Sequence, residues 1–155
     1  MDWDERAQMV HDDESLAWSS TFNDTPQTDI AKWVSSFRDN HPSEFVEHYT
    51  GSFNWSCRIR FNDGLEWLVR FAVPGKVMDG DEKVRREVDT MRFIKANTAI
   101  PVPSVIAWGC RSENPLSLGA YIIMEMFTAN LLTRRFYVKI PQTALYFDLM
   151  LVIGI

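Results

Sequence analysis

The chain has 155 residues, enough for one domain or for one lobe of a larger enzyme with extensions. A hydrophobic fraction of 46% supports a packed core and argues against a disordered chain. The net charge of −5 at pH 7 argues against a partner that is nucleic acid or an anionic membrane surface.

The first segment, residues 1–27, is interpreted as an acidic N-terminal extension. Residues 1–24 carry seven acidic side chains against one basic one, and they lack the apolar region of a secretory signal. We expect this segment to be loosely packed, with one short helix around Glu5–Val10. From Thr28 to Arg38 apolar residues recur every three or four positions, which predicts an amphipathic helix that ends at His41-Pro42.

A β-hairpin is predicted next. Apolar and polar side chains alternate over residues 55–61, which is typical of a half-buried strand. Asn62-Asp63-Gly64 then favours a tight turn, because glycine tolerates the positive φ that such turns need. Residues 66–72 follow as the second strand, antiparallel to the first.

A helix is predicted to begin near Asp79, because Asp79 and Glu82 have the spacing of a capping box. Glu87 falls on or beside the apolar face of this helix, where a carboxylate is costly to bury unless a cation meets it. The apolar positions that define this face are Val84, Val88, Met91 and Ile94.

Two more strands are predicted over residues 105–108 and 120–125, joined by a polar loop. The order is therefore strand, strand, helix, strand, strand, with short connections. This order predicts an α+β fold in which one helix packs on an antiparallel sheet, preceded by a short helical extension.

Several segments together carry more information than the fold alone. Thr50-Gly-Ser-Phe-Asn-Trp55 precedes the hairpin, and Leu68-Val-Arg-Phe71 lies on its second strand. The helix that carries Glu87 leads to Ile100-Pro-Val-Pro103, and Tyr121-Ile-Ile-Met-Glu125 closes the series. In this order the segments resemble the N-terminal lobe of the aminoglycoside phosphotransferase family, especially its fungal members, over roughly residues 45–127. The resemblance implies a protein-kinase-like N-terminal lobe, with its leading helix, over residues 28–127.

The resemblance also implies ATP as the ligand and assigns roles to individual residues. Gly51 and Ser52 would lie in a turn that covers the nucleotide phosphates with its backbone amides. Arg70 would take the place of the lysine that contacts the phosphates in protein kinases, and Glu87 would hold it there. The alternatives are an ordinary turn at Gly51 and a solvated or salt-bridged Arg70.

Glu87 also has an alternative interpretation, as a helix-surface carboxylate paired with one of three neighbouring cations, Arg85, Arg86 or Lys83. The resemblance places Glu125 and Met126 in a connector to a second lobe, where adenine would contact backbone groups. Leu68 and Ala72, on the same strand face as Arg70, would line an adenine pocket or serve simply as core residues, and the core role is preferred.

The resemblance ends after Phe127. Family members continue into a lobe with a His-Gly-Asp motif and with Asn and Asp ligands for Mg²⁺. The three histidines here, His11, His41 and His48, all precede the connector, and none is followed by Gly-Asp. We interpret residues 128–155 as a divergent tail that results from an altered reading frame or a retained intron. The sequence thus predicts a truncated phosphotransferase-like protein that lacks catalysis by itself, with no Mg²⁺ ligands and an unknown phosphate acceptor.

Two other functions compete with this prediction. One is a non-catalytic module that binds nucleotide or a partner, with self-association through the exposed surface of the lobe. The other is an unrelated α+β domain. Two cysteines without metal-ligand spacing, Cys57 and Cys110, favour a reducing compartment, and a cytoplasmic location is expected. The longest apolar run, residues 144–155, is shorter than the roughly 20 residues of a membrane span.

Overall fold

The computed structural model describes residues 2–126 of the chain. The predicted tail at 128–155, and Phe127 before it, lie outside the described residues. The helices and strands, in chain order, are α1 (Trp3–Asp24), α2 (Gln27–Ser35), the 3₁₀ turn η1 (Ser36–Arg38), β1 (Ser43–Thr50), β2 (Asn54–Phe61), β3 (Glu66–Ala72), α3 (Gly80–Asn97), β4 (Val105–Gly109), the 3₁₀ turn η2 (Arg111–Glu113) and β5 (Tyr121–Glu125).

The strands form one five-stranded sheet in the order β1-β2-β3-β5-β4, and every neighbouring pair is antiparallel. The predicted α+β class and the β2–β3 hairpin are confirmed. The hairpin turn contains Gly64 at a φ of 87°, in the left-handed region that favours glycine. Asp79 caps α3 as predicted, because its side chain accepts a hydrogen bond from the Glu82 amide at 3.0 Å.

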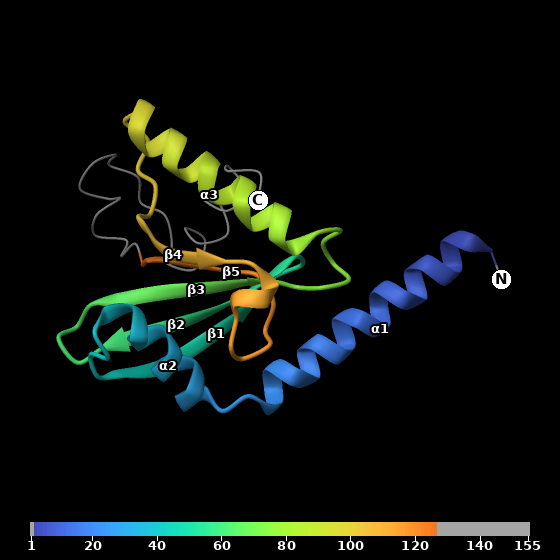
Figure 1. Ribbon diagram of the computed structural model, residues 1–155, viewed down its shortest axis with the longest axis horizontal. Helices are drawn as coiled ribbons and strands as arrows, with labels where there is room; N and C mark the ends of the chain where they lie inside the picture. Colours follow the sequence, from blue (N-terminus) through green and yellow to red (C-terminus); the bar gives the residue numbers. More distant parts are fainter. Residues whose placement is uncertain (1, 127–155) are drawn as a thin grey trace, which may run out of the picture.

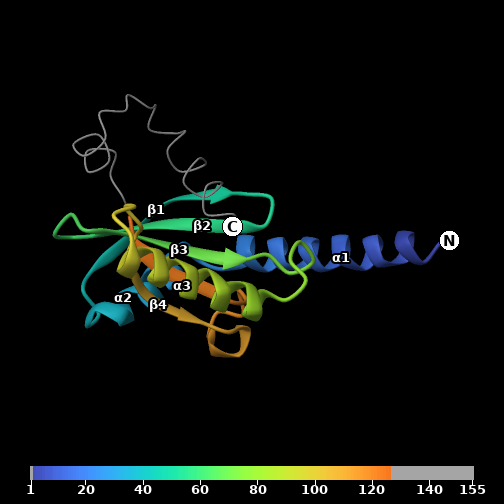
Figure 2. The same cartoon turned by 90° about the horizontal axis from the view of Figure 1, so that it is seen from above.

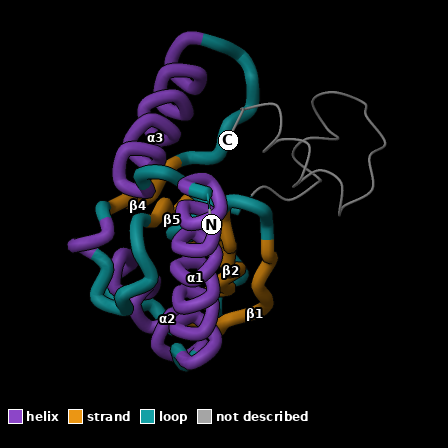
Figure 3. The backbone as a smooth tube through the Cα atoms, turned by 90° about the vertical axis from the view of Figure 1, so that its right-hand side faces the viewer, coloured by secondary structure: helices purple, strands orange, loops and turns teal. Residues whose placement is uncertain are grey.

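Helices cover the two faces of the sheet differently (Figure 1, Figure 3). Odd-numbered residues of β3, such as Val69 and Phe71, share a core with α2 and the end of α1. Even-numbered residues of β3, such as Leu68 and Ala72, share a second core with α3. Figure 2 shows α3 running over the sheet. Its buried apolar side chains, Val84, Val88 and Met91, pack in the same core as Leu68 and Ala72.

The sequence did not predict β1 as a strand. Its register with β2 shifts between Phe45 and Glu47, which marks a β-bulge. A bulge interrupts the period of two, so the apolar positions of β1 do not alternate along the strand. The sheet therefore has one strand more than expected.

The helix predicted around Glu5–Val10 is present, but it is longer than expected. Residues 3–24 form one continuous helix, which extends away from the sheet at its N-terminal end (Figure 1). Asp2 and Glu5 form a capping box at its start. Near its other end Trp18 and Phe22 are buried in the core, and the indole nitrogen of Trp18 donates to the Leu118 carbonyl at 2.9 Å. None of the helices within residues 2–126 is long and apolar enough to span a membrane.

Candidate functional site

The centre of the candidate site is a buried ion pair between β3 and α3. Arg70 is the fifth of the seven residues of β3, and its neighbours across the sheet are Ser56 on β2 and Ile122 on β5. Its side chain is 3% exposed and that of Glu87 is 5% exposed. One guanidinium nitrogen of Arg70 donates to Oε2 of Glu87. The predicted pairing of these two residues is therefore confirmed.

Burial and charge act in opposite directions on this pair. Burial lowers the pKa of the Arg70 guanidinium from its ordinary value, while the charge and the hydrogen bond of Glu87 raise it. Arginine nevertheless stays protonated in proteins, because its ordinary pKa is so high. The site thus holds a permanent cation inside the fold, and Glu87 fixes its orientation.

Lys83 contacts the same carboxylate. Its ammonium donates to Oε1 of Glu87, one helical turn further along α3, and to Oδ1 of Asn54 at 3.2 Å. Burial lowers the pKa of Lys83, and the hydrogen bond to Glu87 opposes that shift. Of the three alternative partners for Glu87, Lys83 is therefore the one that contacts it. Lys83 could not be preferred over Arg85 and Arg86 from sequence, since a four-residue spacing alone does not indicate burial.

Arg85 and Arg86 do not contact Glu87. Both pair with Glu82, at 3.0 Å and 2.7 Å, on the exposed side of α3. The helix therefore carries two glutamates that each contact two cations. Glu87 is buried, and Glu82 lies at the surface.

The turn that contains Gly51 and Ser52 connects β1 to β2 and is exposed. The Gly51 amide donates to the Asn54 carbonyl at 2.8 Å, and a Cβ atom on Gly51 would lie 2.8 Å from that same oxygen. Asn54 faces Ala72 across the hairpin, so the turn lies at the end of β3 that is two residues beyond Arg70. Through Asn54, the turn is also linked to Lys83 on α3.

Glu125 and Met126 lie at the other end of the site, where β5 ends beside the start of β3. The Glu125 amide donates to the Ser104 carbonyl at 3.0 Å, and the Met126 amide donates to the Glu66 carbonyl at 3.1 Å. Neither amide is therefore open to a ligand as a donor. This restricts the predicted contact with adenine to other backbone groups of the connector.

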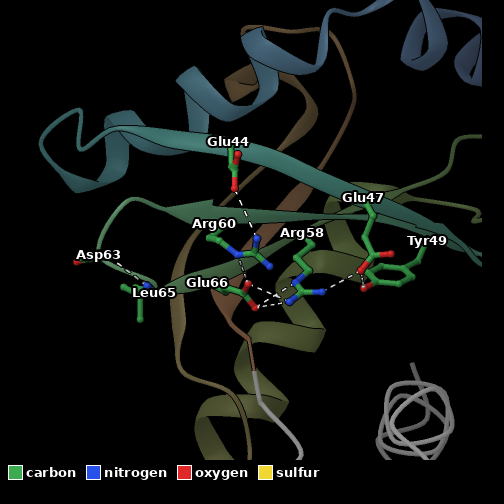
Figure 4. A network of polar contacts seen from close by, with 8 residues as sticks. All are labelled: Glu44, Glu47, Tyr49, Arg58, Arg60, Asp63, Leu65 and Glu66. Atoms are coloured by element: carbon green, nitrogen blue, oxygen red, sulfur yellow. Dashed lines mark hydrogen bonds and ion pairs between the residues drawn. The ribbon is translucent and has the colours of Figure 1, made fainter.

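A charged network occupies the same face of the sheet beside α3 (Figure 4). The Arg58 guanidinium donates to both oxygens of Glu66 at 2.9 to 3.0 Å and to Glu47 at 2.9 Å. Arg60 also contacts Glu66, at 2.7 Å. Burial, together with the hydrogen bond to Glu47, raises the pKa of Tyr49 to about 12. The alternating pattern predicted polar side chains at these strand positions, but it did not predict the ion pairs between them.

Two hollows lie away from these residues. One of about 410 Å³ lies between α2 and β1, and one of about 230 Å³ lies beside the start of α3. Arg70, Lys83 and Glu87 line neither of them. Within residues 2–126, no group of three or more His, Cys, Asp or Glu side chains is arranged to hold a metal ion.

Comparisons with known proteins find short matches to much longer relatives. The chain is 34% identical over 85 residues to a subtelomeric hrmA-associated cluster protein of Aspergillus fumigatus, a match over 55% of this chain and 16% of the relative. It is 28% identical over 99 residues to altered inheritance of mitochondria protein 9, mitochondrial, of Candida dubliniensis, over 61% of this chain and 15% of the relative. The Candida albicans protein of the same name matches to the same extent. No family model matches the chain, and no solved structure matches it significantly.

Proposed function

We propose that residues 28–126 are an ATP-binding lobe related to the N-terminal lobe of the aminoglycoside phosphotransferase family. The observation that carries the proposal is the buried pair of Arg70 on β3 and Glu87 on the helix that follows it. Protein kinases use the same arrangement, in which a cation on the third strand contacts phosphates and a glutamate on the next helix holds it in place.

Stability alone does not account for such a pair. Replacing a buried ion pair by packed apolar residues is often neutral or stabilising, because both charges must be removed from water. Charged groups perturbed by burial and by a specific partner are common at functional sites. A preoriented cation is suited to holding an anion, and here the exposed Gly51-Ser52 turn is linked through Asn54 to the helix that carries Glu87.

The proposal gives each part of the site a role. Backbone amides of the Gly51-Ser52 turn, apart from the Gly51 amide that donates to the Asn54 carbonyl, would contact phosphate oxygens, and Arg70 would neutralise their charge. The connector at Glu125 and Met126 would flank the base, although not through the amides of these two residues. Mg²⁺ would accompany ATP in a complete enzyme of this family, and the chain lacks the His-Gly-Asp segment that the family uses for catalysis.

We therefore propose binding without phosphotransfer by this chain alone. As the alternative, a partner-binding module would use the same lobe without nucleotide. Self-association through the lobe and a cytoplasmic location both stay predictions. One group of relatives is named as mitochondrial, and that location belongs to those relatives.

The test is ATP binding by the 155-residue chain, measured by isothermal titration calorimetry. We expect Arg70→Met to weaken ATP binding at least about tenfold, because a hydrogen bond to a charged group contributes about 1.5–3 kcal/mol. Arg70→Lys, which keeps the charge, should retain part of the affinity. Arg85→Met on the exposed side of α3 is the matched control and should bind ATP as the unmodified chain does.

Circular dichroism of each variant establishes that it is folded. Absence of ATP binding by the unmodified chain would contradict the proposal, as would equal binding by a folded Arg70→Met. Incubation of the same preparation with ATP, Mg²⁺ and hydroxylated acceptors should yield no phosphorylated product.

A further inference from the structure

We propose that Lys83 is a second phosphate-binding residue of this lobe, and that it would hold an oligophosphate between α3 and the β1–β2 turn. This inference rests on the proposed nucleotide binding. Lys83 links α3 to the β1–β2 turn, since its ammonium contacts Glu87 on α3 and the side chain of Asn54 at the start of β2.

Accessibility distinguishes Lys83 from Arg70. The Lys83 side chain is 20% exposed, whereas that of Arg70 is 3% exposed. A ligand that approaches from solvent therefore reaches the ammonium of Lys83 more readily than the guanidinium of Arg70. Lys83 is the cation of the cluster that is placed to make the first contact with a phosphate.

The shared carboxylate makes Lys83 available for this contact. Glu87 carries one negative charge and divides it between two cations, one on each oxygen. If Lys83 turns toward a phosphate, Glu87 keeps Arg70 as its partner, so no isolated carboxylate is left buried. A lysine ammonium has three donors, and within residues 2–126 Lys83 uses them on Glu87 and Asn54 alone. One donor therefore remains for a phosphate oxygen.

The other cations of α3 lack this position. Arg86 is 77% exposed and pairs with Glu82 rather than with Glu87. It provides a control of equal charge on the same helix. A general effect of positive charge on anion binding would change by a similar amount when either cation is removed, whereas a direct contact requires Lys83.

The experiment is a calorimetric titration of the full chain with ATP, with inorganic tripolyphosphate and with adenosine. We expect Lys83→Gln to weaken ATP and tripolyphosphate binding about five- to twentyfold, to leave adenosine binding unchanged, and to be partly rescued by Lys83→Arg. Arg86→Gln should stay within about twofold of the unmodified chain. If the unmodified chain binds ATP and Lys83→Gln binds it equally well, the assignment of Lys83 is wrong while the proposed function stands. If the unmodified chain binds neither ATP nor tripolyphosphate, both are wrong.

A measurement on the unmodified chain covers the case in which Lys83 variants do not fold. Reductive methylation followed by mass spectrometry reports the accessibility of each lysine. We expect tripolyphosphate to protect Lys83 and not Lys76, which lies in the loop before α3 and pairs with Asp12. Equal methylation of Lys83 with and without tripolyphosphate would overturn the assignment.

Discussion

At the scale of single residues, the main contrast is between the two glutamates of α3. Glu82 and Glu87 each contact two cations, but Glu82 is 41% exposed and Glu87 is 5% exposed. Exposed pairs contribute little because water and salt screen them, whereas a buried charge that loses its partner is left without solvation. Neutralising the carboxylate should therefore lower the free energy of unfolding much more at Glu87 than at Glu82.

We expect Glu87→Gln to lower the free energy of unfolding by about 3–5 kcal/mol, because Arg70 and Lys83 would lose their shared anion. Glu82→Gln should lower it by no more than about 1 kcal/mol, since its partners are solvated. Urea denaturation followed by circular dichroism measures both. A Glu87→Gln variant as stable as Glu82→Gln would show that the buried carboxylate contributes little to the fold.

The family resemblance implied the Arg70–Glu87 pair, and the place of Glu87 on an apolar helix face supported it. A glutamate on an apolar helix face requires a cation, and the strand before it supplies Arg70. The roles of Lys83 and Glu66 were not predictable in this way. Both occupy ordinary polar positions, and only the packing of α3 on the sheet and the register of the hairpin bring them against Glu87 and Arg58.

At the scale of elements, prediction succeeded where local signals were complete. The β2–β3 hairpin has alternating strands and a glycine turn, and α3 has a cap and an apolar face. The edge strand β1 lacks regular alternation because of its bulge. For α1 only Trp18 and Phe22, one turn apart, are buried, so the apolar pattern that would indicate a long packed helix is weak.

The contact of α1 with the loop before α3 can be tested through glycine. Gly75 has a φ of +78°, and a Cβ atom there would lie 2.1 Å from the His11 carbonyl oxygen of α1. Gly64 has a similar φ of +87°, but nothing lies within 4 Å of its Cβ position. Alanine at either position introduces the same backbone strain, so the difference between the two variants isolates the contact with α1.

We expect Gly75→Ala to be less stable than Gly64→Ala by about 1–3 kcal/mol, the usual cost of overpacking. Urea denaturation gives the two stabilities, and amide hydrogen exchange should show faster exchange in α1 for Gly75→Ala alone. Equal stability with unchanged exchange would mean that α1 does not pack against this loop in solution.

At the scale of the whole molecule, the question is whether α1 belongs to the lobe. The predicted boundary at residue 27 falls at the first residue of α2, and α1 and α2 bury side chains in one core. Trp18 and Phe22 of α1 pack with Val34 of α2 and with Phe71 of β3. An edge-to-face contact joins Trp18 to Trp55, with ring centroids 5.2 Å apart. The last turns of α1 thus contribute to the same face of the sheet as α2.

We expect Trp18→Ala to lower the free energy of unfolding of the whole lobe by about 3–5 kcal/mol, because it leaves a large cavity and removes the hydrogen bond to Leu118. Trp3→Ala is the matched control, since Trp3 is 83% exposed on the same helix, and its effect should stay within about 0.5 kcal/mol. Far-ultraviolet circular dichroism is the suitable probe, because both variants remove a fluorescent tryptophan. One cooperative transition at lower urea in Trp18→Ala would show that α1 and the sheet unfold together. Loss of α1 alone, with the sheet as stable as before, would instead show that the N-terminal helix is a separate unit attached to an independently stable lobe.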